Sequence, residues 1–117
     1  MTVEKLQNAY YVTSDMERSV GFYRDALGLD MVFQDGENWT QFKAGGVNFA
    51  MASKEEAPEG ALGATVVFEV DDIEAVSGAL EAAGGEILGT RDMGDHGKTL
   101  SFRDPDGNLV QLYQRAS

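Results

Sequence analysis

The chain has 117 residues, 43% of them apolar, and its 20 acidic against 9 basic side chains give a formal net charge of −11. This length predicts one domain, and the charge argues against nucleic-acid or anionic-lipid partners, because it repels phosphate groups. The sequence has neither a run of about 18 apolar residues that would span a membrane nor a secretory signal, so we expect a cytoplasmic protein. With no cysteine, disulfides and thiolate chemistry are excluded.

The first half of the chain predicts a strand, a helix and three more strands. Residues 8–13 are rich in β-formers, and Ser14 and Glu17 have the spacing of a capping box that begins a helix. Apolar residues then recur at three- and four-residue steps until Gly28 ends the helix. Three further strands are predicted at 29–34, 39–43 and 47–52, where turn-forming residues separate them.

The second half repeats this order. A strand at 65–70 precedes a helix capped by Asp71 and Asp72, and strands follow at 86–89, 98–103 and 108–114. Asp15 and Asp72 are 57 positions apart, as are Gly28 and Gly85. Such a repeat indicates two copies of one βαβββ unit. We therefore predict a single α+β domain over 1–117, with module one at about 6–53, a polar linker at about 54–61 and module two at about 62–115.

A hairpin near the end of the chain carries the strongest local signal. Asp104-Pro105-Asp106-Gly107-Asn108 combines residues that favour a tight turn. Apolar residues alternate with polar ones on both sides of it, which predicts two half-buried strands. Gln111 then lies on the face opposite Val110 and Leu112.

The paired βαβββ pattern, the segment 15–28 after the first strand and the segment 102–112 near the end together resemble the vicinal oxygen chelate superfamily. This superfamily includes glyoxalase I, extradiol dioxygenases, fosfomycin-modifying enzymes and bleomycin-sequestering proteins. The resemblance covers nearly the whole chain and implies a cup-shaped mixed β-sheet with helices on its outer face. A homodimer is also implied, with modules paired within one chain or across two chains.

In the metal enzymes of this superfamily, ligands project into the cup from four strands. The resemblance matches these positions to Asn8, Thr65 and Gln111, with Asn48 or Ala50 as the fourth. Amides and hydroxyls are weak neutral ligands for first-row divalent metals, so we expect no metal or other cofactor; a divalent metal is the alternative. His96, the single histidine, lies in a glycine-flanked loop and is expected to be a solvated or rim residue.

Strand alternation predicts which side chains line the open cup. Those that could contact a ligand are Asn8, Tyr10, Trp39, Asn48, Thr65, Gln111 and Tyr113. Trp39 could stack on a planar or cationic ligand, or it could fill the sheet or a dimer interface. Glu69 is the carboxylate expected in the cup, where it could act as a general base, although its place at a strand end also suits a hydrated side chain.

These residues support two functional hypotheses. The first is a metal-free small-molecule binding protein of the bleomycin-resistance type, holding an aromatic or cationic organic ligand, with the negative charge favouring a cation. The second is a glyoxalase-like lyase, isomerase or dioxygenase with an atypical metal site or with Glu69 as a base. A third possibility is a family member whose role is protein association.

Overall fold

The computed structural model describes residues 6–58 and 63–117. It contains two four-stranded sheets with the orders β1-β4-β3-β2 and β5-β8-β7-β6, which we call sheet A and sheet B. Sheet A consists of β1 (Ala9–Thr13), β2 (Asp30–Asp35), β3 (Trp39–Ala44) and β4 (Val47–Ser53). Sheet B consists of β5 (Val66–Glu69), β6 (Glu86–Asp92), β7 (Lys98–Arg103) and β8 (Leu109–Gln114).

The two sheets have the same topology. In each, the first strand of the module pairs in parallel with the last, and the remaining neighbours are antiparallel. The second strand of each module contains a register irregularity, at 31–33 in β2 and at 87–89 in β6. The predicted α+β fold of two βαβββ modules is confirmed. Of the predicted linker, residues 54–56 form a short 3-10 turn, whereas 59–61 lie outside the described residues.

The first helix differs in detail from the prediction. It begins at Met16, and its cap is Asp15, whose side chain accepts a hydrogen bond from the Arg18 backbone N–H. Ser14 is therefore not the cap; its backbone N–H and hydroxyl instead donate to Asp106. After α1 (Met16–Val20) the helix continues as a π-helical segment, η1 (Gly21–Ala26). The second helix, α2 (Ile73–Ala82), is capped by Asp72 as predicted.

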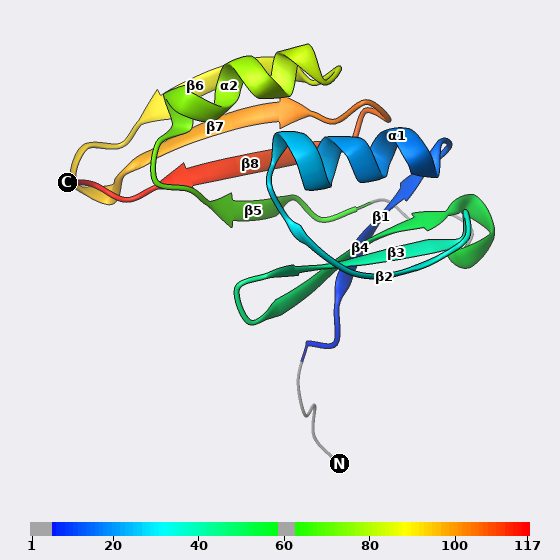
Figure 1. Ribbon diagram of the computed structural model, residues 1–117. Helices are drawn as coiled ribbons and strands as arrows, with labels where there is room; N and C mark the ends of the chain where they lie inside the picture. The colour runs from blue at the N-terminus through cyan, green and yellow to red at the C-terminus, as the bar shows by residue number, and fades with distance from the viewer. Residues whose placement is uncertain (1–5, 59–62) are drawn as a thin grey trace.

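Both sheets turn one face toward a shared core. The segment formed by α1 and η1 lies over sheet A and beside β8 of sheet B, while α2 covers β6 and β7 (Figure 1). One continuous cluster of buried side chains joins the parts; it includes Tyr11, Phe22, Tyr23, Phe42, Phe49, Leu80, Leu100, Phe102, Val110 and Leu112. The apolar residues of the two strands beside the last turn, Leu100, Phe102, Val110 and Leu112, are at most 1% exposed. The hydrophobic effect therefore holds both modules against one helical segment.

The Asp104–Asn108 turn makes polar contacts between the modules. Asp106 accepts hydrogen bonds from Thr13 Oγ1 at 2.7 Å, from Ser14 and from Ser19, and forms an ion pair with Arg18 Nη2 at 2.7 Å. Its pKa would be raised by burial, but the hydrogen bonds from Ser14, Thr13 and Ser19 outweigh this effect and hold the pKa below its ordinary value.

A second carboxylate in the same turn is almost fully buried. Asp104 Oδ2 accepts from Tyr23 Oη at 2.8 Å and from Asn108 Nδ2 at 2.9 Å, and the side chain of Asn108 also donates to Val12 O. Burial and the neighbouring Asp104 raise the pKa of Tyr23 far above its ordinary value, so this hydroxyl stays protonated as a donor. The turn that closes module two is therefore bonded to module one.

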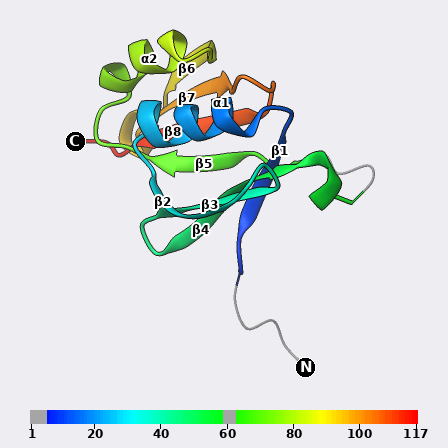
Figure 2. The same ribbon diagram turned by 45° about the vertical axis from the view of Figure 1, so that its right-hand side comes forward.

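Because the core-side faces of both sheets pack on the same helical segment, their opposite faces point away from each other. The two views agree, with sheet A below α1 and sheet B behind it (Figures 1 and 2). We call these opposite faces the open faces. Within the described residues no helix is long and apolar enough to cross a membrane.

Candidate functional site

An aromatic pair marks the open face of sheet A. Tyr10 lies next to Ala50 in the β1–β4 register, and Ala50 lies next to Gln41 in β3. The rings of Tyr10 and Trp39 are tilted by 57° with centroids 5.1 Å apart. Trp39 Nε1 donates to Gln41 Oε1 at 3.3 Å, so the indole N–H has a partner within the protein. The pair thus offers aromatic ring surface to a ligand.

Near this pair, Asn48 has one satisfied and one unsatisfied polar atom. Its Nδ2 donates to the Gln7 carbonyl at 3.2 Å. Its Oδ1 is buried and has no hydrogen-bond donor in the described part of the chain. Buried acceptors normally have a partner, so a ligand N–H or O–H group could fill this role.

The open face of sheet B is polar. Gln111 lies between Val67 and Ser101 in the register, and its Nε2 donates to Ser101 Oγ at 3.0 Å. Tyr113 lies one row further along, between Glu69 and Thr99. A shallow cavity of about 340 Å³ covers part of this face and is lined by Leu88, Gly89, Arg91, Thr99, Ser101 and Gln111, with Thr90 and Met93.

The predicted ligand-binding residues therefore fall into two groups. Asn8, Tyr10, Trp39 and Asn48 belong to sheet A or its N-terminal approach, whereas Gln111 and Tyr113 belong to sheet B. Thr65 is exposed just before β5. Within one chain the two open faces point apart, so these groups do not line a common cavity. The sequence repeat indicated which side chains share a face, but the angle between the sheets depends on packing around α1 and η1.

Glu69 is a half-exposed carboxylate with a cationic partner. Its Oε2 forms an ion pair with Arg115 Nε at 2.8 Å, and its side chain is 50% exposed. A general base at neutral pH normally needs desolvation or a like charge nearby. Glu69 is instead paired with a cation and exposed to solvent.

The residues present do not fit a divalent metal. Among the described residues, no three His, Cys, Asp or Glu side chains come together as a possible metal site. The positions matched by the resemblance carry amides and a hydroxyl, and the Gln111 amide is already bonded to Ser101. His96 is exposed in a 3-10 turn at 94–96. Such neutral donors bind first-row metals weakly.

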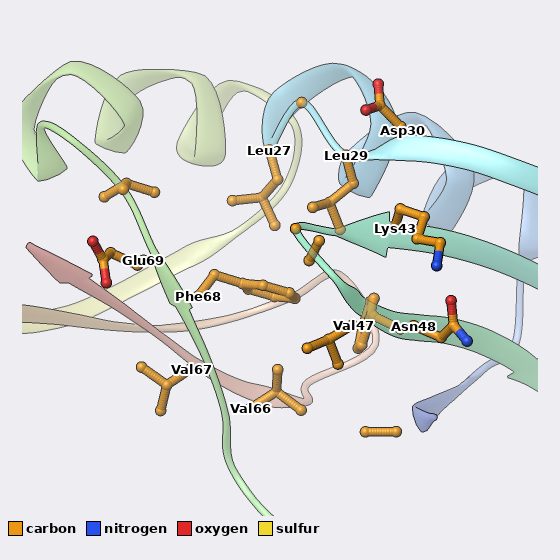
Figure 3. A pocket seen from close by; sticks show the side chains of 16 residues that line it. Leu27, Leu29, Asp30, Lys43, Val47, Asn48, Val66, Val67, Phe68 and Glu69 are labelled. Carbon is orange, nitrogen blue, oxygen red and sulfur yellow. The ribbon is translucent and has the colours of Figure 1, made fainter. Parts of the chain in front are cut away.

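Another cavity lies between β5 and module one. It has a volume of about 520 Å³ and is bounded by the end of the helical segment, the β3–β4 hairpin and β5 (Figure 3). Leu27, Leu29, Val47 and Phe68 line it, with Asp30, Lys43 and Glu69 also contributing. Val47 and Val67 at this cavity are 51% and 52% exposed. Sequence reasoning did not predict this cavity, because it depends on the docking of the modules.

Ser101 and Arg91 were also not predicted as site residues. Both could have been placed on the open face by strand alternation from Gln111, had the β6–β7 register been known. The predicted strand at 86–89 ends too early: β6 continues to Asp92, which brings Arg91 opposite Thr99.

Comparison with known proteins agrees with this architecture. The model of the Glyoxalase/Bleomycin resistance protein/Dioxygenase superfamily matches residues 5–112. The chain belongs to this superfamily, and the α+β fold of two βαβββ modules expected from the resemblance is confirmed.

Individual relatives are more distant. The chain is 25% identical, over 95% of its length and 80% of the relative, to metallothiol transferase FosB of Shouchella clausii. It is similar in structure to lactoylglutathione lyase from Agrobacterium tumefaciens, with a TM-score of 0.75 and 21% identity over 97% of this chain and 96% of the other. A FosX mutant from Listeria monocytogenes complexed with Mn(II) has a TM-score of 0.75 and 15% identity, over 98% and 93% of the two chains.

Proposed function

We propose that this protein binds an aromatic small molecule on its open faces and does so without a resident metal. The observation that carries the proposal is the Tyr10–Trp39 pair, whose ring centroids are 5.1 Å apart on the open face of sheet A. Aromatic surface with a few neutral hydrogen-bonding groups is typical of small-molecule sites. The unsatisfied Asn48 Oδ1 nearby supplies one such group.

The side chains at the positions matched to metal ligands support the proposal that no metal is bound. FosB is named a metallothiol transferase, and the FosX structure holds Mn(II), so a metal is the natural alternative in this superfamily. In this chain, the matched positions hold neutral side chains. Elemental analysis of the purified protein should find well under one Mn, Fe, Ni, Zn or Cu per chain. A stoichiometric metal that a chelator removes with loss of ligand binding would contradict the proposal.

Ligand binding can be followed through Trp39, because it is the only tryptophan in the chain. An uncharged planar probe, naphthalene-2-carboxamide, should change Trp39 fluorescence in a saturable manner. Tyr10→Leu should weaken this binding about threefold to tenfold, since one stacking surface is lost. Val32→Ala, at an exposed apolar residue of the edge strand β2, is the matched control and should leave the affinity unchanged.

We also propose that two copies of the chain form a homodimer that completes the site. The strands β1 and β5 end their sheets, and strand edges favour pairing with another chain. Val47 and Val67 add exposed apolar surface there. A second copy at these edges would set the open face of sheet A of one chain beside the open face of sheet B of the other, which a single chain does not do.

Sedimentation analysis tests this assembly. The wild-type protein should be a dimer at micromolar concentration, and Val67→Asp should shift it toward monomer. Leu88→Asp places the same charge at a similarly exposed residue, 47% against 52% for Val67, on the distant edge strand β6, and should remain dimeric. A monomeric wild-type protein would contradict the proposal.

An enzymatic role is the second candidate, because the names of the two similar proteins above, a transferase and a lyase, describe enzymes. The Glu69 version of this candidate is disfavoured by the Arg115 ion pair and by exposure. If a substrate is found, loss of turnover in Glu69→Gln with binding retained would support the enzyme against the binding protein.

A further inference from the structure

The charges on the open face of sheet B differ in sign from the charge of the whole chain. The chain carries −11, but three of its five arginines, Arg91, Arg103 and Arg115, lie on or next to this face. Their positions follow from the register: Arg91 is opposite Thr99, which is opposite Tyr113, and Arg103 is opposite Leu109. The acidic side chains that the register places on the same face are Glu69 and Glu86.

Two of the three arginines are neutralised locally. Arg115 Nε pairs with Glu69 Oε2 at 2.8 Å, and Arg103 Nε lies 3.7 Å from Glu86 Oε1. Arg91 forms no ion pair with any of the residues 6–58 and 63–117. It lines the cavity of about 340 Å³ on this face. The cavity therefore has one cationic side chain without a counter-charge from the described residues.

The Gln111 amide prepares a second anion-binding group. Gln111 Nε2 donates to Ser101 Oγ at 3.0 Å, so one of the two lone pairs of Ser101 Oγ is used and the hydroxyl hydrogen can be donated elsewhere. A glutamate at position 111 would reverse this arrangement by accepting the hydroxyl hydrogen and by repelling an anion. The amide thus makes Ser101 a donor at the floor of the cavity.

Space for a ligand group lies beside Ser101. The residue opposite it in β6 is Gly89, at the irregular part of the strand. A Cβ atom built on Gly89 would have no atom within 4 Å. The missing side chain leaves the Ser101 hydroxyl accessible between Gln111 and the next row of the sheet, where Arg91 lies.

We propose that the ligand of this open face carries an anionic group, such as a carboxylate, phosphate or sulfonate, that accepts a hydrogen bond from Ser101 and pairs with Arg91. This inference rests on the proposed ligand-binding function and on the proposed homodimer, which sets the two open faces side by side, and it specifies the ligand as an aromatic anion. The net charge of the chain favours cations at long range, but solvent ions screen that field beyond about 10 Å. Contacts inside the cavity then decide which ligand binds.

Three planar probes of nearly equal shape test the inference: naphthalene-2-carboxylate, naphthalene-2-carboxamide and naphthalene-2-carboxamidine, with charges of −1, 0 and +1. Isothermal titration calorimetry measures each affinity at low and moderate salt. The carboxylate should bind about fivefold or more tightly than the carboxamide, and added salt should reduce this preference. Tightest binding of the carboxamidine by the wild-type protein would overturn the inference.

Variants assign the preference to particular groups. Arg91→Gln should remove most of the carboxylate preference while leaving carboxamide affinity unchanged, and Gln111→Glu should change the preference to the carboxamidine. Arg24→Gln makes the same charge change on the helical segment, outside the open face, and should preserve the wild-type order. A carboxylate preference unaffected by Arg91→Gln would overturn the inference.

The probes also separate this inference from the proposed function. Equal affinity for all three probes would reject the anion site but leave the aromatic binding function intact. Absence of binding by all three would reject both.

Discussion

The corresponding turns of the two modules differ in what their side chains do. In module one, the β3–β4 turn at 44–46 is formed by alanine and glycine, and Cβ atoms built on Gly45 and Gly46 would meet nothing within 4 Å. In module two, the turn between β7 and β8 contains Asp104 and Asp106, which bond to module one. Both turns reverse the chain, and Gly45 and Gly107 both have positive φ. The difference shows that one turn only connects strands, whereas the other also orients the modules.

Among the substitutions that test this difference between the turns, Asp104→Ala should destabilise the protein most. This change removes the acceptor for Tyr23 Oη and for the side-chain and backbone donors of the turn, and leaves the Tyr23 hydroxyl buried without that partner. We expect a loss of about 3 kcal/mol in the free energy of unfolding, measured by urea denaturation. The matched control is Gly46→Ala in the module-one turn, which should change stability by less than about 0.5 kcal/mol. If both substitutions lowered the free energy of unfolding equally, the module-two turn would not contribute more to docking than the module-one turn.

Asp106→Asn should have a smaller effect. The amide keeps the shape of the side chain but loses the charge that pairs with Arg18 and one acceptor oxygen for Thr13, Ser14 and Ser19. We expect a loss of about 1–2 kcal/mol at neutral pH. A double-mutant cycle with Arg18→Gln should give a positive coupling energy. Simple additivity of the two changes would show that the ion pair is not part of the docking contact.

The pH dependence of stability gives a third measurement. The pKa of folded Asp106 lies below its ordinary value of 3.8, so its carboxylate stabilises the fold above the unfolded-state pKa. That contribution disappears as the pH falls through the folded-state pKa. The stability difference between wild type and Asp106→Asn should therefore be constant near neutral pH and decrease below about pH 4. A difference that grows with acidification would contradict the assigned direction of the shift.

Glu69→Gln should have the smallest effect. Its partner Arg115 is 77% exposed and Glu69 itself is 50% exposed, and exposed ion pairs contribute little because water solvates both charges. We expect a stability change below about 0.5 kcal/mol by urea denaturation. A loss above about 1 kcal/mol would show that this pair has a structural role similar to the docked turn.

The sequence was most informative where local chemistry decides structure. The repeat of strand, helix and three strands, the Asp72 cap, and the burial of Phe102 and Val110 followed from periodicity and turn residues. The prediction that Ser14 caps the first helix was wrong. The Ser14 hydroxyl and backbone N–H instead donate hydrogen bonds to Asp106, 92 positions away. Asp15 then serves as the cap of α1. Competition of this kind depends on tertiary contacts and has no local signal.

For the candidate site, too, some features follow from local sequence and others from tertiary contacts. The sequence by itself determined which side chains share a face, because strand alternation is a local property: Tyr10 and Trp39 on one sheet, and Gln111 and Tyr113 on the other. Only the tertiary structure decided that these two faces point apart, since burial of Tyr23, Phe22 and their neighbours draws both sheets onto one helical segment. It also decided that Gln111 bonds Ser101 beside Arg91, because the register of β6 against β7 and β8 sets which side chains are neighbours.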